Sequence, residues 1–492
     1  MHAEGGPAAD ANPRGEEIAA MFARHGERYR IWAVVTVMLG TFSAVMEATI
    51  VNVALPDIIR AFGVGQDRVQ LVSTGFLAAT TASMLSSSWA IGRFGLRATY
   101  LGALWLLMLF SVLAAATGTD HFWLLALCRI AQGAIAGLIQ PLAMLAIVDV
   151  FPAQQRGRAM SAYGLGIVLS PAIGPVVGGL LVDHFGWRAV FLMTLPFCLA
   201  AAALAPRYVV RGRPPAAARK QPLDVAGLLL LIAALTALLG GLSASFAHPA
   251  ALALAAAGLA AAALFIVRQA RSAHPLLDFR LFRRPGFGAA ILVTVAYGMG
   301  LYGSTYLGPL FAQEVARFSA FEAGAMLVPG GILLALVLMV SGRLSDRTQP
   351  HRVAMAGLAC FAGAAALLAA SSAESGFWTL AAWVALGRIG LGLVIPGLNA
   401  GALRLLPAGA EAAGAAAINF FRQLGGAFGV TLLALFLEAR QRAYAGVPQA
   451  ADGVYAWLQR NRGFTEGFCI IALLYALALI PARRMSAARP KN

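Results

Sequence analysis

The chain of 492 residues is 60% hydrophobic and only 12% charged, and its mean hydropathy is +0.76. Soluble domains carry roughly 25% charged residues, so this composition indicates a protein that lies in a lipid bilayer. The net charge of +16 does not indicate nucleic-acid binding, because the longest polar stretches, residues 1–30 and about 438–463, are too short for a basic soluble domain. The same shortness excludes a soluble catalytic domain.

Fourteen apolar segments are long enough for a membrane-spanning helix, which needs about 20 residues. They form a group of six, a pair and a second group of six. The first six lie near 31–53, 69–91, 98–117, 122–142, 158–182 and 189–205; the pair lies near 225–243 and 250–267; the last six lie near 287–311, 322–341, 353–370, 376–397, 412–437 and 464–481. The sequence therefore predicts an all-α polytopic membrane protein with fourteen spans.

This pattern also predicts the domain organisation. We expect an N-terminal tail (1–30), an N-terminal six-helix half (31–205), a linker with two inserted spans (206–286), a C-terminal six-helix half (287–482) and a C-terminal tail (483–492).

Basic residues lie mainly on one side of these segments. With the N-terminus in the cytoplasm, 26 of the 37 Lys and Arg residues fall on the cytoplasmic side, 8 on the opposite side and 3 inside spans. Cytoplasmic loops of membrane proteins carry such an excess of positive charge. Both tails are therefore predicted to be cytoplasmic.

The two six-span groups resemble each other. The stretch around Arg93 recurs in altered form around Arg347, each after the second span of its group, and Arg129 in CRIAQG matches Arg388 in GRIGLG. The two matches have nearly the same offset, which indicates a parallel duplication with the seventh and eighth spans inserted between the halves.

Ionisable side chains inside spans are costly and are candidates for function. Glu47 is the one deep acid, and counting 1.5 Å per residue places Arg129 at a similar depth. Gln132 and Gln140 continue a polar and small stripe on the span of Arg129. A proton-carrying site at Glu47 and a purely structural tether between Glu47 and Arg129 are both open at this point.

Other polar residues, together with Asn52, Gln132 and Gln140, are candidates for the lining of a substrate cavity. Arg388 and Arg422 lie near mid-membrane without an acid in their own half, a surplus of charge that could attract an anionic solute. Tyr297, Tyr302 and Tyr306 lie on roughly one helix face, where they either line a pocket for amphiphiles or pack between helices.

The fifth span has small residues four apart, among them Gly174 and Gly178, with Pro175 between them. Such a seam permits close helix packing. The seam of the fifth span is equally consistent with an ordinary tight helix contact and with a seal between the two halves.

Several chemistries have no support in the sequence. The only two lysines, Lys220 and Lys491, follow Arg and Pro, so a phosphate-binding P-loop for ATP is excluded. The seven histidines have no metal-ligand spacing, and the four cysteines suggest no disulfide. We expect no catalytic residues, no metal and no cofactor.

These motifs resemble the major facilitator superfamily, and specifically its fourteen-span drug/proton antiporter branch of the EmrB/QacA type. MEATIVNVALP (46–56), with Glu47 and Asn52, is similar to the branch's first-span motif, which usually has Asp at the acidic position. Leu125 to Gly137, SPAIGPVVGG (170–179) and RQLGGAFG (422–429) match further motifs. The Arg422 motif looks like a general feature of the branch, which argues against the anionic solute.

The loop motif of the family reads Gly-x-x-x-Asp-Arg and departs from this pattern in the N-terminal half. There Ser88 and Gly92 replace Gly and Asp, and Arg93, Gly95 and Arg97 remain. The C-terminal half keeps Gly342, Asp346 and Arg347. We therefore expect the loop of that half to be the one that stabilises one conformation of the protein.

The resemblance implies a secondary transporter that exports drugs or other small amphiphiles in exchange for protons, and no enzyme. We expect a multi-pass protein of the bacterial inner membrane, a monomer whose partners are its substrate, protons and lipid, with no nucleic acid or ATP. A periplasmic adaptor is possible but not required, because the segment of 26 residues between the last two spans (438–463) is short for binding one. The alternatives are a transporter of one metabolite, such as an organic acid, a peptide or a siderophore-like compound, and a non-transporting membrane sensor.

Overall fold

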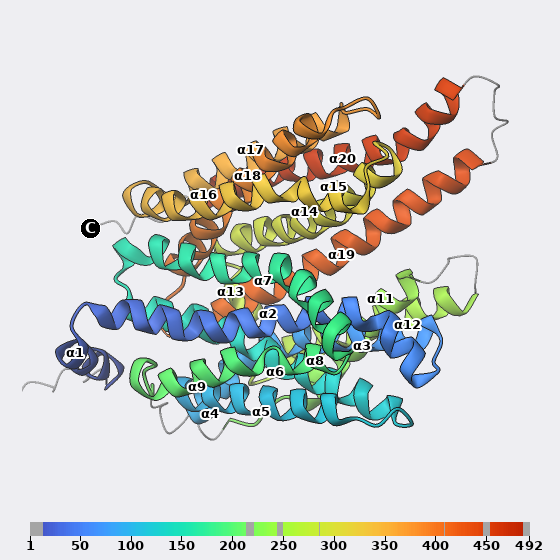
Figure 1. The fold of residues 1–492 in the computed structure, drawn as a ribbon. Helices are drawn as coiled ribbons and strands as arrows, with labels where there is room; N and C mark the ends of the chain where they lie inside the picture. Colours follow the sequence, from blue (N-terminus) through green and yellow to red (C-terminus); the bar gives the residue numbers. More distant parts are fainter. Residues whose placement is uncertain are drawn as a thin grey trace, which may run out of the picture.

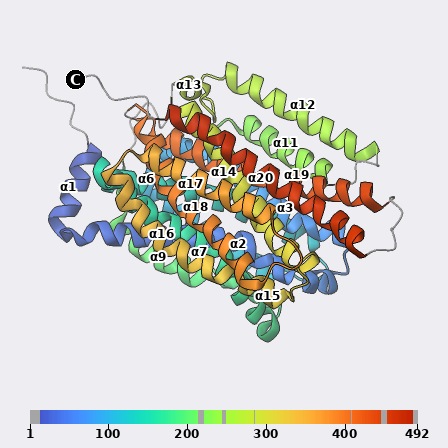
Figure 2. The same cartoon turned by 90° about the horizontal axis from the view of Figure 1, so that it is seen from above.

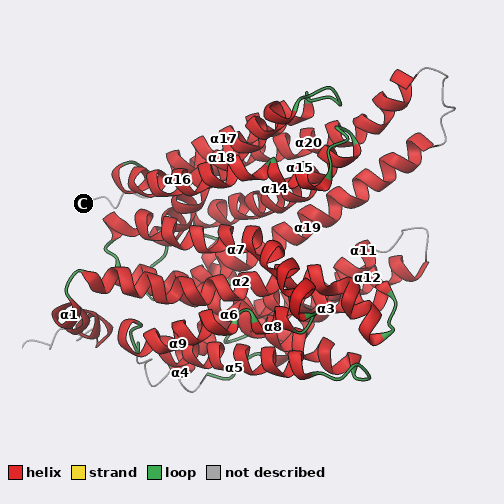
Figure 3. Cartoon of the chain, viewed as in Figure 1, coloured by secondary structure: helices red, strands yellow, loops and turns green. Residues whose placement is uncertain are grey.

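A computed structural model describes residues 13–212, 221–243, 249–284, 286–407, 409–445 and 453–485. Within these ranges the regular elements are all helices, without a strand (Figure 3). The all-α prediction is confirmed for this part of the chain. Twelve helical segments of the described residues are long and apolar enough to cross a membrane, so the predicted count of fourteen is not confirmed by length and composition.

The first group of helices forms the N-terminal half. It comprises α1 (Pro13–His25), α2 (Arg28–Phe62), α3 (Gln66–Ser83), the 3₁₀ turn η1 (Met84–Ser86), α4 (Ser87–Phe94), α5 (Leu96–Ala116), α6 (Phe122–Val150), the 3₁₀ turn η2 (Ala153–Gln155), α7 (Arg156–Phe185), α8 (Ala189–Leu192) and α9 (Leu195–Tyr208). Within this half α2 packs against α3, α6, α7 and α9.

The remaining helices form an inserted segment and the C-terminal half. The insertion comprises α11 (Val225–Ser243), α12 (Pro249–Arg271) and α13 (Phe279–Phe282), and the C-terminal half comprises α14 (Phe287–Glu314), α15 (Ala320–Ala325), α16 (Leu327–Arg347), α17 (Pro350–Ala369), α18 (Phe377–Arg404), α19 (Glu411–Ala445) and α20 (Gly453–Arg484). The two halves lie side by side (Figures 1 and 2). We call the end of the bundle that holds α1 and the C-terminus of α20 the tail end.

The outer faces of the helices are apolar. On α5, for example, Trp105, Leu109 and Val112 are each about half exposed, whereas Tyr100 and Leu104 are buried. An outer surface rich in large apolar side chains is unsuited to water and suits contact with lipid.

The second predicted span is interrupted by a run of serines. Ser83, Ser86 and Ser87 each donate a hydrogen bond to the carbonyl three residues earlier, and a 3₁₀ turn separates α3 from α4 at this point. Serine hydroxyls that bond to nearby carbonyls compete with regular helix geometry, which accounts for the break.

The polar N-terminal segment also contains structure that the hydropathy pattern does not predict. Met21 is buried and Phe22 half buried in a small cluster with Tyr29 and Val150, so α1 packs against the tail end of the N-terminal half. Glu16 and Arg24 on its other side are exposed. A search for continuous apolar segments misses such an amphipathic surface helix.

The inserted helix α11 contacts both halves. It packs against α12, against α3 of the N-terminal half and against α19 of the C-terminal half. The pair therefore covers one side of the boundary between the halves, with α12 on the outside.

The glycine seam of α7 faces α2 in the same half. A β-carbon at Gly174 would lie 2.7 Å from Oγ1 of Thr49, and one at Gly178 would lie 2.8 Å from Cγ1 of Ile50. The seam is thus a close contact inside the N-terminal half. A different glycine, Gly164, faces Leu338 and Ile395 of the other half.

Gly174→Leu should therefore overpack the contact between α7 and α2. Overpacking costs about 1–3 kcal/mol, so the unfolding temperature of the purified protein should fall while membrane insertion persists. The matched control is Gly179→Leu on the same helix, where the nearest neighbour of a β-carbon is 3.9 Å away. Equal losses in the two variants would contradict a specific contact at Gly174.

Candidate functional site

The deep acid and the arginine of the fourth predicted span meet inside the N-terminal half. Nη1 of Arg129 on α6 lies 3.3 Å from Oε1 of Glu47 on α2, and the side chains are 1% and 0% exposed. Nη2 of Arg129 also donates to the backbone carbonyl of Glu47 at 3.1 Å, and Nε donates to that of Val72 at 3.1 Å. Ion pair and backbone contacts together hold α6 against α2 and α3.

Gln132 completes this cluster from the next turn of α6. Its Nε2 donates to Oε1 of Glu47 at 2.7 Å and to Oγ of Ser111 at 2.9 Å, while its Oε1 accepts from Nη1 of Arg129 at 3.0 Å. The second carboxylate oxygen of Glu47, Oε2, is buried and has no hydrogen-bond partner among the described residues. The cluster thus leaves one carboxylate oxygen without a hydrogen bond from Arg129 or Gln132, and the hydroxyl of Thr194 lies near the same carboxyl group.

A second polar cluster joins the two halves. Nη2 of Arg422 on α19 donates to Oε1 of Gln140 on α6 at 2.9 Å and to Oδ1 of Asn419 at 2.7 Å. The hydroxyl of Tyr163 on α7 donates to Oδ1 of Asn419 at 3.1 Å. This cluster lies where α6 and α7 contact α19 and α18, at the boundary of the halves.

The three tyrosines that the sequence suggested as a cavity lining do not point into one cavity. Tyr297 is buried inside the C-terminal half, the hydroxyl of Tyr302 donates to Oε1 of Gln423 at 3.3 Å, and Tyr306 is 36% exposed. Asn52 is exposed and accepts a hydrogen bond from Ser73 at 2.8 Å, and Arg388 on α18 is half buried. The three tyrosines thus have three different environments and do not line one common pocket.

The C-terminal loop motif makes a contact between the halves at the tail end. Oδ1 and Oδ2 of Asp346 on α16 accept the backbone N–H groups of Gly157 and Arg158, at 2.7 and 3.1 Å. These N–H groups belong to the first turn of α7, which lacks a capping side chain of its own. Asp346 thus caps a helix of the opposite half, where a negative charge also suits the helix dipole.

The neighbouring motif residues permit this contact. A β-carbon at Gly342 would lie 2.7 Å from Cα of Arg158, so a larger residue would separate α16 from α7. Arg347 is exposed at the end of α16.

In the N-terminal half the corresponding residues hold α1. Gly95 has φ of +87°, which favours glycine, and Arg97 donates from Nε to the carbonyl of Val209 at 2.6 Å. Nη2 of Arg97 lies 3.4 Å from Oε1 of Glu17 on α1, and Arg93 is exposed. Pro175 belongs to α7, and its side chain lies outside the described part of the structure.

Three residues of these clusters were missed by the sequence analysis. Asn419 precedes Arg422 by three residues and so shares its helix face, a spacing that could have revealed it. Ser111 and Tyr163 give no comparable signal, because single hydroxyl groups are common in membrane helices.

Metal binding has no visible site in the described ranges. No group of three or more His, Cys, Asp and Glu side chains is placed there to hold a metal ion.

Removal of the Asp346 carboxylate should open the tail end. In Asp346→Ala the first turn of α7 loses both acceptors, so spin labels at Gln154 and Thr348 should give longer and broader distances in double electron–electron resonance. The labels are attached as cysteines in a background without native cysteine. The matched control is Asp278→Ala, because Asp278 caps only its own helix α13. An unchanged distance distribution in the Asp346 variant would exclude this capping as a closing contact.

Comparisons with known proteins agree with this architecture. The family model for the Major Facilitator Superfamily matches residues 37–430. The chain is 30% identical over 408 residues to a multidrug resistance protein B homolog of Mycobacterium tuberculosis, covering 81% of this chain and 75% of that protein. It is 29% identical over 460 residues to the methylenomycin A resistance protein of Streptomyces coelicolor, covering 92% and 91%.

Solved structures show the same fold. A proton:xylose symporter superposes with a TM-score of 0.65 at 13% identity, covering 92% of this chain and 94% of that one. With a family model that spans most of the chain and two halves of packed helices, the protein belongs to the major facilitator superfamily of membrane transporters.

Proposed function

We propose that this transporter exports drugs or other small amphiphiles in exchange for protons, as a member of the fourteen-span EmrB/QacA-type branch. The observation that carries the proposal is the buried carboxylate of Glu47, with Arg129 and Gln132 on one oxygen and no partner on the other among the described residues. The resistance named for relatives in Mycobacterium tuberculosis and Streptomyces coelicolor supports export.

Two further helices make fourteen spans from the twelve that length and composition identify. The segment α3–η1–α4 packs against α6, and α7 packs against α2 and α16. Both run through the interior of the bundle, where polar and small residues replace the apolar surface that a lipid-facing helix needs. The division into six, two and six spans is part of this proposal.

The tail end is proposed to face the cytoplasm. Most Lys and Arg residues lie on that side in the fourteen-span arrangement, and cytoplasmic loops attract such charge. In this orientation Asp346 closes the cytoplasmic end, as expected for a conformation that exchanges solutes with the outside. The protein is proposed to act as a monomer in the inner membrane without an obligatory adaptor.

Reporter fusions test this orientation. Fusions at Pro214 and Asn492, which both lie outside the described residues, should give cytoplasmic activity with a reporter that is active only there. A fusion at Asp120, between α5 and α6, should be active only with an external reporter. External activity at Pro214 or Asn492 would refute the orientation.

Glu47 is proposed to carry the proton. A carboxyl group in a medium of low dielectric constant prefers its neutral form, while a guanidinium nearby favours the charged form. If the halves move and change the hydration of Glu47 or its contact with Arg129, the proton affinity of the carboxyl changes with the conformation. Such a change is what exchange requires: the proton is taken up from outside and released inside, alternating with the substrate.

Glu47→Gln should abolish proton-driven transport yet retain substrate binding, because the amide resembles the neutral carboxyl but cannot release a proton. Glu47→Asp, which has the acid usual in the branch, should keep partial activity. The measurements are dye transport and substrate-induced proton release in proteoliposomes, with binding assayed separately.

The matched control is Glu374→Gln, which removes an exposed carboxylate between α17 and α18. Full proton-coupled transport by the Glu47→Gln variant would eliminate Glu47 as the carrier and favour the structural tether.

A further inference from the structure

Charge is balanced in the interior of the N-terminal half and unbalanced in that of the C-terminal half. Arg129 has Glu47 as its ion partner. Arg422 is 5% exposed, and neither it nor Arg388 forms an ion pair within the described residues. Arginine stays charged in proteins, and a buried charge without a counter-charge costs several kcal/mol.

The two arginines belong to one region of the C-terminal half. Arg388 lies on α18 with its Cγ against Gly330 of α16, and Arg422 lies on α19. Helix α14 contacts both α18 and α19. At Gly298 its backbone packs against the carbonyl of Arg422. The Tyr297 carbonyl accepts a hydrogen bond at 3.1 Å from Tyr475, whose ring stacks on Phe361 at 4.4 Å. Tyr297 therefore lies in the region between the turn of Arg422 and the Phe361 ring.

Hydrogen-bonding groups in this region are left without partners. The hydroxyl of Tyr297, which is 1% exposed, has no hydrogen-bond partner among the described residues, and neither has Nε of Arg422. Arg388, whose side chain is half buried, forms no hydrogen bond or ion pair with the described residues. Buried donors are normally satisfied, so unpaired donors beside positive charges fit an anionic acceptor that binds from outside the chain.

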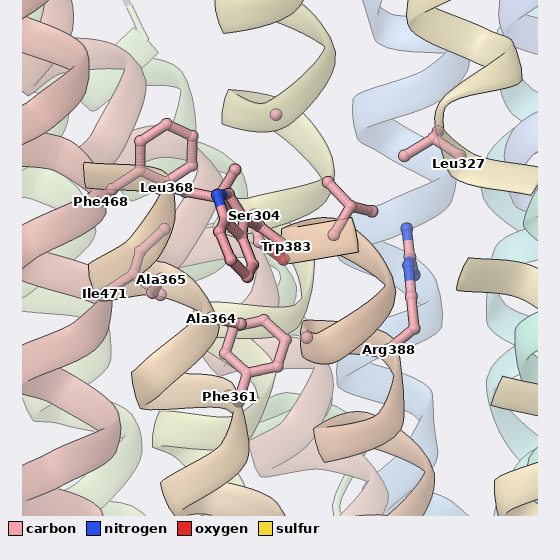
Figure 4. A pocket seen from close by; sticks show the side chains of 13 residues that line it. Ser304, Leu327, Phe361, Ala364, Ala365, Leu368, Trp383, Arg388, Phe468 and Ile471 are labelled. Carbon is pink, nitrogen blue, oxygen red and sulfur yellow. The ribbon is translucent and has the colours of Figure 1, made fainter. Parts of the chain in front are cut away.

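An apolar hollow begins beside Arg388. Its lining includes Leu327, Phe361, Trp383 and Phe468 with Arg388, and Figure 4 shows Arg388 and Leu327 on one side and Trp383 and Phe468 on the other. The hollow has room for about 30 Å³ in this conformation, about one water molecule. An apolar group would enter as these side chains rotate, and the aromatic rings favour a flat ring system.

We propose that Arg388, Tyr297 and Arg422 bind the anionic head group of an amphiphilic substrate, a carboxylate or sulfonate, while its apolar part occupies the hollow of Phe361, Trp383 and Phe468. The inference deepens the proposed function, on which it rests, by naming the substrate class as aryl or alkyl anions. The guanidinium groups supply charge-assisted hydrogen bonds, and the Tyr297 hydroxyl supplies a neutral one.

Three naphthalene compounds test the charge selectivity: 1-naphthaleneacetate, its neutral amide and the 1-naphthylmethylammonium cation. Binding to the full chain in lipid nanodiscs is measured by equilibrium dialysis. The carboxylate should bind at least about tenfold more tightly than the amide, a difference of about 1.4 kcal/mol. The cation should bind more weakly than either.

Variants locate the site. Arg388→Gln and Arg422→Gln should each remove most of the preference for the carboxylate while retaining amide binding, which reports an intact fold. Arg388→Glu should shift the preference to the cation. The matched control Arg352→Gln, an exposed arginine of α17 in the same half, should keep the wild-type preference. Equal affinity of the wild type for carboxylate and amide, or an unchanged preference in both site variants, would overturn the proposal.

The binding assay separates this inference from proton-coupled export. A wild-type protein that shows no preference for the carboxylate but has intact proton-coupled dye transport would refute the anion site alone. A carboxylate preference that depends on Arg388, in a protein that neither transports dye nor releases protons, would support the anion site and refute proton-coupled export.

Discussion

The burial of one carboxylate among helices of the N-terminal half is the constraint on which the rest of the arrangement depends. Glu47 is fully buried, and Arg129 reaches it from α6 with hydrogen bonds to its side chain and to its backbone. Removing one member of such a pair leaves an uncompensated buried charge, which costs about 3–5 kcal/mol. The relative positions of α2, α3 and α6 are therefore fixed by electrostatics as much as by packing.

The long membrane-spanning helices and the deep ionisable residues could be predicted from the sequence. The contacts between the two halves could not. Apolar length is a local property, so the long helices follow from it, and the matching depths of Glu47 and Arg129 follow from counting residues. The capping of α7 by Asp346 joins residues 189 positions apart in the chain and depends on how the two halves dock. No local sequence pattern predicts how the halves dock. The contact of Arg422 with Gln140 across the same boundary could therefore not be predicted either.

The glycine seam of α7 illustrates a different limit. Small residues four apart predict that some helix comes close, but they do not say which one. The structure pairs Gly174 and Gly178 with α2 of the same half, whereas Gly157 and Gly164 face the other half. One helix thus has a face for its own half and a face for the opposite half, and only three-dimensional packing distinguishes them.

Helix α6 connects the two polar clusters. Arg129 and Gln132 bind Glu47, and two turns further Gln140 accepts the hydrogen bond from Arg422 of the C-terminal half. A helix transmits rotation along its length because its backbone hydrogen bonds keep successive turns in register. In the proposed mechanism, protonation of Glu47 weakens its attraction to Arg129, and the resulting shift of α6 acts directly on the contact of Gln140 with Arg422. An anion bound at Arg422 would bias the same contact from the other side. Proton and substrate would then compete through one helix without binding to a shared residue, so the N-terminal half would carry the coupling and the C-terminal half the recognition.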